Sequence, residues 1–261
     1  MPGNRILIDV GNTAIKIAFA AASGIQVFSL ETRCRSAASL GADLMRLMEQ
    51  QSMDKESVSS CAVCSVVPDM DPLLGQAVAH CIGCPVYFVP SDLPVPLENR
   101  YKNAAQLGAD RLVAAWAARE LYPEKDALVI LDFGTVVSCD CVKGNAFLGG
   151  LLFPGLQAAM SAMTQNAAKL PAVSFECADD ESFIGRDTAT CMRHGILYGF
   201  AGMAEALVAR ARQELAVPCS VIATGGFARL MARYCPSVEA VCTDLSLRGL
   251  DLLCSRKEQG L

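Results

Sequence analysis

Long apolar runs are missing from this sequence. None reaches the roughly 18 residues that a membrane-spanning helix requires. The first apolar run meets Asp9 too soon to form the apolar region of a signal peptide. We therefore expect a cytoplasmic protein that has no membrane partner.

Positive charge is also scarce. The formal net charge is -5, and Lys and Arg form no cluster along the chain. Sequence-independent binding to nucleic acid depends on such a cluster, so we expect no nucleic-acid partner. An anionic small molecule can still be bound by backbone amides and a few well-placed cations.

Histidines and familiar nucleotide-binding motifs are nearly absent. The only histidines, His80 and His194, have no recognisable catalytic context, which disfavours a Ser–His or Cys–His hydrolase. There is no G-x-x-x-x-G-K-[ST] loop, and no Rossmann fingerprint in which a helix follows the glycines. The usual P-loop and dinucleotide-binding folds are therefore disfavoured.

Cysteine is abundant, with 13 residues, an odd number that favours reduced thiols over a disulfide framework. The spacing of Cys61, Cys64, Cys81 and Cys84 fits a zinc-ribbon template. However, Cys61 and Cys64 lie in an expected strand, where residues three apart face opposite sides. The pattern favours cysteines that fill the core over a zinc site.

Periodicity predicts an α/β fold in two halves, residues 1–123 and 124–261. The first half begins with three expected strands joined by short turns. An alternation of helix and strand follows, then a Pro-rich loop over 90–103 and a long helix over 107–123. The second half begins in the same way near 127. It continues with expected helices over 155–168 and 188–214, a strand over 219–224, a helix over 227–234, a strand over 238–243 and a helix over 245–254.

One short motif occurs in both halves. ILIDVGNT at 6–13 and VILDFGT at 129–135 each have an apolar run, then Asp, one apolar residue, Gly and, at or after the next position, Thr. A single such turn is ordinary turn chemistry, but two at corresponding places indicate a duplication with a shared role. Facing each other across a cleft, the turns would offer amides and hydroxyls to a polyphosphate. Asp9 and Asp132 could then hold a hydrated Mg²⁺, and Lys16 could reach a phosphate.

Two further segments fit a phosphoryl transferase. Thr224, Gly225 and Gly226 follow a strand and open a helix, where their amides could bind the ribose and base end of ATP. Asp110 lies in the first turn of the helix that follows the Pro-rich loop. It is placed to act as a base, with Arg111 as a ligand for a substrate carboxylate.

The ordered set of motifs resembles the type III pantothenate kinases, which belong to the superfamily of acetate and sugar kinases, heat-shock chaperone ATPases and actin. The resemblance rests on DVGNTAIK, YKNAAQLGADR, DFGTVVSCD, GGLLFPG, IGRDTATCMRHGILYG, TGG and DLSLRGL, and it spans nearly the whole chain. It implies two ribonuclease-H-like (actin-like ATPase) halves, each with a mixed sheet. It also implies a homodimer that phosphorylates pantothenate with Mg-ATP, the first step towards coenzyme A, aided by K⁺ or NH₄⁺.

The resemblance also implies roles for individual residues. Asp110 would be the general base. ATP and its phosphates would be bound by Asp9, Gly11, Asn12, Thr13, Lys16, Gly134, Thr135, Thr224, Gly225 and Gly226. Pantothenate would be bound by Tyr101, Gly108, Ala109, Asp110 and Arg111, with Thr188 contributed across the dimer interface. Asp132 would lie at the monovalent cation, and Asp9 would bind Mg²⁺ through water.

The sequence departs from the family pattern at three positions. Val136 replaces an Ala and Ser138 a Thr in the second phosphate motif, and Ala104 replaces the Pro that usually follows Asn103. Val136 adds bulk near the expected phosphate path, Ser138 keeps a hydroxyl, and Ala104 makes the loop less rigid. Two alternatives stay open: a non-catalytic relative acting as a regulatory accessory factor, and a kinase of the same superfamily for another small hydroxylated substrate.

Overall fold

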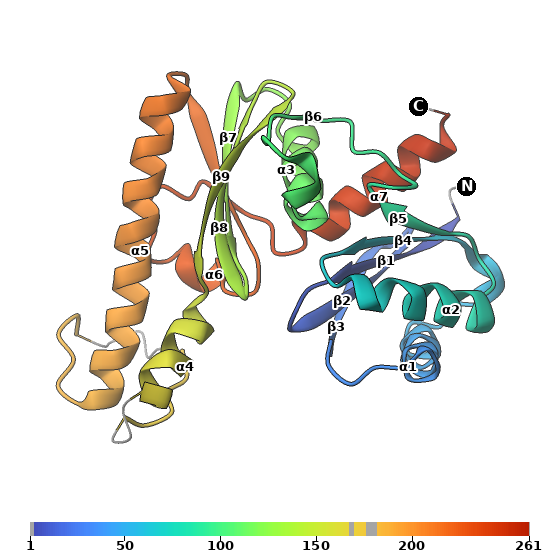
Figure 1. Cartoon of the computed structure of the whole chain (residues 1–261), viewed down its shortest axis with the longest axis horizontal. Coiled ribbons are helices and arrows are strands. Elements are labelled where there is room, and N and C mark those ends of the chain that lie inside the picture. The colour runs from blue at the N-terminus through green and yellow to red at the C-terminus, as the bar shows by residue number, and fades with distance from the viewer. Residues whose placement is uncertain (1–2, 167–169, 176–181, 261) are drawn as a thin grey trace. The chain divides into compact units, whose positions relative to one another are not determined.

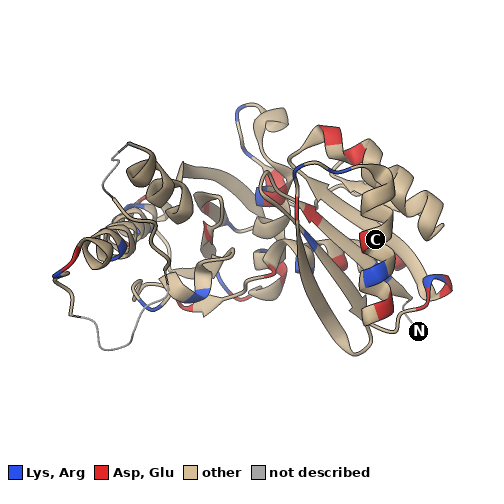
Figure 2. Ribbon diagram, turned by 90° about the horizontal axis from the view of Figure 1, so that it is seen from below, with Lys and Arg blue, Asp and Glu red and all other residues tan. Residues whose placement is uncertain are grey.

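The chain forms two compact α/β units (Figure 1). The computed structural model describes residues 3–166, 170–175 and 182–260. Unit 1 comprises Met1–Leu121 and Asp244–Leu261, and unit 2 comprises Tyr122–Thr243. Within the described ranges, no helix combines the length and the hydropathy that a membrane span requires. Figure 2 shows acidic and basic residues interspersed along both units.

Unit 1 is built on a mixed sheet with the strand order β3-β2-β1-β4-β5. Its strands are β1 (Asn4–Val10), β2 (Ala14–Ala21), β3 (Gly24–Glu31), β4 (Val58–Ser65) and β5 (Val86–Val89). Unit 1 also contains the two-residue β6 (Glu98–Asn99), which is not part of this sheet. The first three form an antiparallel meander, and β4 and β5 run parallel to β1. Its helices are α1 (Ala37–Gln50), α2 (Asp71–Cys81), α3 (Ala109–Leu121) and α7 (Leu245–Glu258).

Alternation along the strands of unit 1 assigns side chains to two faces. Ile6, Ile8 and Val10 of β1 pack in the core that α1 and α2 share. The residues between them therefore face the other side of the sheet, where α7 packs on β1 and β4 and α3 packs on β4 and α7. Asp9 is one of these residues, so its carboxylate lies on the face that α3 and α7 cover.

Helix α7 packs in unit 1, although the sequence places it in the second half. Buried Arg5 of β1 donates hydrogen bonds to Asp251 Oδ1 at 2.7 Å and to Ser255 Oγ at 2.6 Å. At Gly249, a Cβ would lie 2.6 Å from Val113 Cγ1 and 2.9 Å from Val113 O. Because glycine has no side chain, α7 can lie directly against α3. The predicted domain boundary at 123–124 therefore omits this return of the chain to unit 1.

Unit 2 repeats the strand order of unit 1. Its strands are β7 (Ala127–Phe133), β8 (Val136–Lys143), β9 (Ala146–Pro154), β10 (Cys219–Thr224) and β11 (Ala240–Val241), and its helices are α4 (Leu156–Asn166), α5 (Thr188–Leu215) and α6 (Ala228–Met231). The order β11-β10-β7-β8-β9 matches β5-β4-β1-β2-β3, again with an antiparallel meander followed by parallel strands. The predicted duplication is therefore present in the topology.

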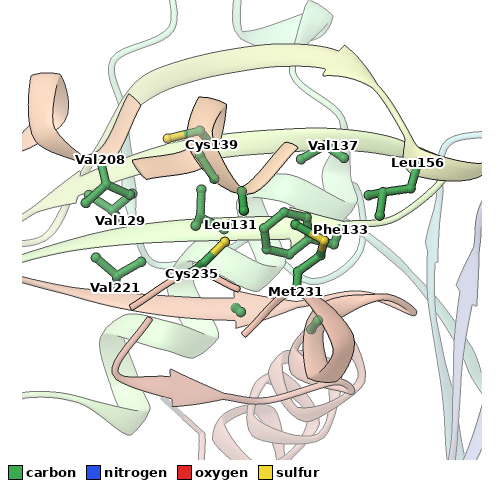
Figure 3. Packing of buried hydrophobic residues seen from close by; sticks show 14 of the residues in the cluster. Val129, Leu131, Phe133, Val137, Cys139, Leu156, Val208, Val221, Met231 and Cys235 are labelled. Carbon is green, nitrogen blue, oxygen red and sulfur yellow. The ribbon is translucent and has the colours of Figure 1, made fainter. Parts of the chain in front are cut away.

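The core of unit 2 lies between one face of its sheet and the helices. Leu131 and Phe133 of β7, Val137 and Cys139 of β8 and Val221 of β10 point into it. Figure 3 shows them packed with Leu156, Val208 and Met231 from α4, α5 and α6. Asp132, between Leu131 and Phe133, lies on the opposite face.

Several predicted elements differ in extent from the structure. The strand predicted over 238–243 is the two-residue β11, and the helix predicted over 245–254 is α7, which continues to Glu258. The helix predicted over 155–168 is α4, and residues 167–168 lie outside the described residues. The helix predicted over 227–234 is the single turn α6, because its hydrogen bonds tighten at Arg233 and Tyr234 and Pro236 follows. The loop predicted over 90–103 contains the short strand β6.

Candidate active site

The first phosphate turn joins β1 to β2. Gly11 N donates to Ala14 O at 3.0 Å and closes the turn, and Asn12 and Thr13 are exposed at its tip. Thr32, buried just after β3, donates from Oγ1 to Gly11 O at 2.7 Å and from its amide to Thr13 O at 3.2 Å. The turn is thus held from the side, and its tip stays open to solvent.

Asp9, Lys16 and Cys64 lie side by side on the face of the sheet below α3 and α7. Lys16 of β2 pairs directly with Asp9, and so does Cys64 of β4 from the other side. Cys64 is fully buried, and burial together with the charges of Asp9 and Asp110 raises the pKa of its thiol well above the usual value. The thiol therefore stays protonated and adds no further negative charge.

Asp110 lies near these groups at the start of α3. Burial is the largest influence on its carboxyl and raises the pKa, whereas the Arg111 amide, which donates to Oδ1 at 2.8 Å, and the charge of Lys16 lower it. The pKa of Asp9 is raised by burial and by Asp110, against the Ser246 hydroxyl and Lys16. The structure therefore brings Asp9, Lys16 and Asp110 into one electrostatic cluster.

The absence of a side chain at Gly108 leaves room for the carboxylate of Asp110. A Cβ on Gly108 would overlap Asp110 Oδ1 and lie 3.4 Å from Val66 Cγ1. The carboxylate thus folds back over the residue that precedes α3, and Ala109 begins the helix. In the GADR motif, Gly108 therefore leaves the space that the carboxylate of Asp110, in the first turn of α3, occupies.

Tyr101 and Arg111 also come together. The Arg111 guanidinium lies 5.7 Å from the centre of the Tyr101 ring. The Asn99 side chain fixes the backbone nearby, because its Oδ1 accepts from Tyr101 N at 2.9 Å. A guanidinium held against an aromatic ring keeps donors to offer a carboxylate.

The second phosphate turn joins β7 to β8 in unit 2. Asp132 is the penultimate residue of β7, and its Oδ1 is buried. A Cβ on Gly134 would lie 3.2 Å from that atom, and a Cβ on Gly225 would overlap it. Glycines of the second turn and of the Thr224–Gly226 segment therefore lie against one carboxylate.

The backbone conformation of Gly225 allows its close contact with the Asp132 carboxylate. Its φ is +90°, which favours glycine, and a Cβ there would also lie 2.7 Å from Phe133 C. Phe227 N donates to Phe133 O at 3.1 Å and ties the segment to the end of β7. Thr224 is buried, whereas Gly226 is exposed with open space around it.

The substituted positions of the second motif have different surroundings. Ser138, opposite Asp132 in the β7–β8 pair, is buried and donates to Asp140 Oδ2 at 2.7 Å. The Ser138 hydroxyl is therefore engaged in a hydrogen bond to the buried Asp140 carboxylate. Val136 is 51% exposed at the start of β8, beside the exposed Thr135.

Thr188 lies at the start of the long helix α5 in unit 2. It is the exposed first residue of α5, and the preceding Asp187 caps the helix by accepting from Thr190 N at 2.9 Å. The helix start is thus well defined, and the Thr188 side chain is presented at the surface.

Sequence reasoning missed two contacts. Thr32 holds the first turn, and Ser246 Oγ donates to Asp9 Oδ2 at 2.6 Å. Ser246 lies in the DLSLRGL motif, to which the sequence assigned no role. A local pattern cannot reveal these contacts, because they depend on β3 pairing with β2 and on α7 packing against β1.

The donor chemistry of the first turn fits Mg²⁺. Mg²⁺ binds one or two carboxylates and completes its shell with water and phosphate oxygens, and Asp9 offers such a carboxylate. Within residues 3–166, 170–175 and 182–260, no group of three or more His, Cys, Asp and Glu is arranged to hold a metal. Protein ligands alone therefore form no cage there.

The chain is similar to type III pantothenate kinases along most of its length. The model of that family matches residues 5–210. The Desulfovibrio desulfuricans protein "Type III pantothenate kinase" is 47% identical over 252 residues, which cover 96% of each chain. The protein of that name from Lawsonia intracellularis is 40% identical and covers 97% of this chain and 96% of its own.

Solved structures share the fold at low sequence identity. A Campylobacter jejuni structure named for the Baf family of transcriptional activators aligns with a TM-score of 0.61 at 15% identity, covering 97% of this chain and 99% of that one. A ROK family transcriptional regulator aligns with a TM-score of 0.52 at 11% identity, covering 97% and 78%. These likenesses concern the fold.

Proposed function

Because the chain belongs to the type III pantothenate kinase family, we propose that it transfers the γ-phosphoryl group of ATP to the primary hydroxyl of pantothenate. The products are 4'-phosphopantothenate and ADP, and the reaction is the first step of coenzyme A synthesis. The observation that carries this proposal is the cluster of Asp9, Lys16 and Asp110 on one face of the unit 1 sheet. It supplies a base, a cation and a metal-binding carboxylate.

Asp110 is the general base. It accepts the proton of the pantothenate hydroxyl as that oxygen bonds to phosphorus and ADP leaves. The raised pKa of its carboxyl makes the ionised form a stronger base than an exposed aspartate. Gly108 leaves the space in which this carboxylate rests.

Pantothenate is held by residues around α3. Arg111 binds its carboxylate, and Tyr101 orients the guanidinium from the ring side. Gly108 and Ala109 contribute backbone at the start of the helix. We assign Thr188 to the same substrate across a homodimer interface, with the exposed start of α5 as support.

ATP is bound by both phosphate turns. In unit 1, Gly11, Asn12 and Thr13 offer amides and hydroxyls to phosphate oxygens, and Lys16 offers a cation. In unit 2, Gly134 and Thr135 play the same part. The Thr224–Gly226 segment serves the ribose and base, where exposed Gly226 allows close approach.

Cations complete the proposed site. Asp9 would hold Mg²⁺ through water, and Asp132 would lie at a K⁺ or NH₄⁺ ion. Bound there, the ions supply positive charge that neutralises the phosphates. The carboxylates of both residues are oxygen donors, which these hard cations prefer. We place the reaction, a step of coenzyme A biosynthesis, in the cytoplasm.

The test is ADP release by the purified full chain with pantothenate and Mg-ATP, with K⁺, with NH₄⁺ and with neither. We expect turnover that depends on pantothenate and rises with either monovalent cation. Absence of turnover under every cation would overturn the kinase proposal. Equal turnover without a monovalent cation would overturn only the role given to Asp132.

A further inference from the structure

Ser246 makes a contact that the proposed function does not yet use. It lies in the first turn of α7, is 9% exposed, and donates from Oγ to Asp9 Oδ2 at 2.6 Å. The two residues are 237 positions apart. Among the residues that the structure describes, Ser246 is the only side chain that hydrogen-bonds the Asp9 carboxylate.

The charges around Asp9 pull its carboxylate in different directions. Lys16 from β2 attracts it and Asp110 from α3 repels it, while Cys64 from β4 is a neutral thiol beside it. Charges alone therefore do not define one orientation of the carboxylate. A short bond from a hydroxyl to one oxygen does, because hydrogen bonds to ionised groups are strong and directional.

The hydroxyl is itself held in place. Helix α7 lies against α3 at Gly249, and Arg5 fixes its later turns through Asp251. The neighbours Leu245 and Leu247 are fully buried and anchor the first turn. Ser246 therefore meets Asp9 as a fixed donor on a rigid helix, which is what a supporting residue of a functional site requires.

We propose that Ser246 is a positioning residue for phosphoryl transfer: its hydrogen bond to Oδ2 orients the Asp9 carboxylate towards hydrated Mg²⁺ and the phosphates of ATP. This inference rests on the proposed role of Asp9 in binding Mg-ATP. It assigns to the C-terminal DLSLRGL segment a function in the binding of Mg-ATP. Pantothenate binding does not depend on it.

The test compares Ser246→Ala with the wild-type chain. We expect the KM for Mg-ATP, and the Kd for Mg-ADP in isothermal titration calorimetry, to rise about 10- to 100-fold, as when the hydrogen-bond partner of a metal ligand is removed. The KM for pantothenate should stay within about twofold. Unchanged nucleotide constants, or equal rises for both substrates, would overturn the proposal.

A matched pair separates the hydroxyl from packing. Ser246→Thr and Ser246→Val add the same bulk, but only Thr keeps the donor. We expect Thr to bind Mg-ADP at least tenfold more tightly than Val at similar melting temperatures, and equal binding would contradict the role. Ser255→Ala is the control for α7 docking, because Ser255 accepts from Arg5 and does not touch Asp9. It should alter the melting temperature without altering Kd.

These outcomes are distinct from failure of the proposed function. If the wild-type chain released no ADP with pantothenate, the kinase proposal would fail, whereas the Mg-ADP titrations would still test the role of Ser246. If wild-type turnover were normal and Ser246→Ala matched it in every nucleotide constant, only the positioning role would fail.

Discussion

Gly108 lies so close to the carboxylate of Asp110 that a single methyl group at Gly108 would overlap Asp110 Oδ1. The proposed base therefore owes its resting position to the absence of a side chain two residues before it. The contact involves the end of a side chain and not the backbone. A substitution should consequently move the carboxylate and leave the fold intact.

Gly108→Ala should lower kcat by about 100-fold, because a displacement of about 1 Å at a catalytic group costs that much. Steady-state ADP release would measure it, and the melting temperature should change little. The control is Gly75→Ala in α2, where a Cβ meets nothing within 4 Å. That variant should keep full turnover. A Gly108→Ala enzyme with near-normal kcat would show that the carboxylate position is not critical.

Asp110→Asn should reduce turnover by about 10²- to 10⁴-fold, the usual contribution of a general base. Mg-ATP binding should persist, because the substitution removes the base and leaves the phosphate turns unchanged. Calorimetry with Mg-ADP would check this. Asp69→Asn, at an exposed surface position, is the control and should change neither quantity. Near-normal turnover of Asp110→Asn would mean that another group takes the proton.

The same substitution should stabilise the ligand-free protein at neutral pH. Burial raises the pKa of Asp110 in the folded state, so the unfolded chain releases this proton at lower pH. The free energy of unfolding therefore falls as pH rises from the unfolded pKa to the folded one, and the deficit persists above it. An asparagine at position 110 does not ionise, so the variant does not lose this free energy of unfolding. Melting temperatures should agree near pH 3 and favour Asp110→Asn at pH 7, and a lower value at pH 7 would contradict the burial argument.

Lys16→Met should raise the KM for Mg-ATP about 10- to 100-fold, because a hydrogen bond to a charged group contributes about 1.5–3 kcal/mol. Loss of the charge also raises the pKa values of Asp9 and Asp110 further, since Lys16 lowers both. Initial rates at varied Mg-ATP would measure the effect. Lys55→Met is the matched control, because it removes the same charge from an exposed turn. Equal effects of the two would imply only a general change of net charge.

Gly225→Ala and Gly226→Ala should separate folding from nucleotide binding. Gly225 has φ +90° and no room for a Cβ, so its substitution should destabilise unit 2 by about 1–3 kcal/mol. Gly226 has open space, so its substitution should leave the melting temperature unchanged. If ATP approaches the Gly226 backbone, the KM for Mg-ATP should rise in that variant alone. Unchanged KM at normal stability would remove Gly226 from the site.

Much of this architecture is already present in the sequence. The apolar runs that end in Asp9 and Asp132, with short turns after them, predicted the duplicated meanders, because local hydrophobic period and turn chemistry determine such elements. Pro123 marked the end of the helix that forms α3 for a local reason as well. The start of α3 at GADR followed from the same kind of signal.

Other features depend on contacts between distant segments. No local pattern showed that α7 returns to unit 1, because that result depends on Gly249 fitting against Val113 and on Arg5 reaching Asp251. The sequence predicted which residues would carry the chemistry. Only the tertiary structure decided which residues hydrogen-bond them, such as Ser246 at Asp9. These two residues are 237 positions apart in the sequence, so they meet only once α7 packs against the sheet.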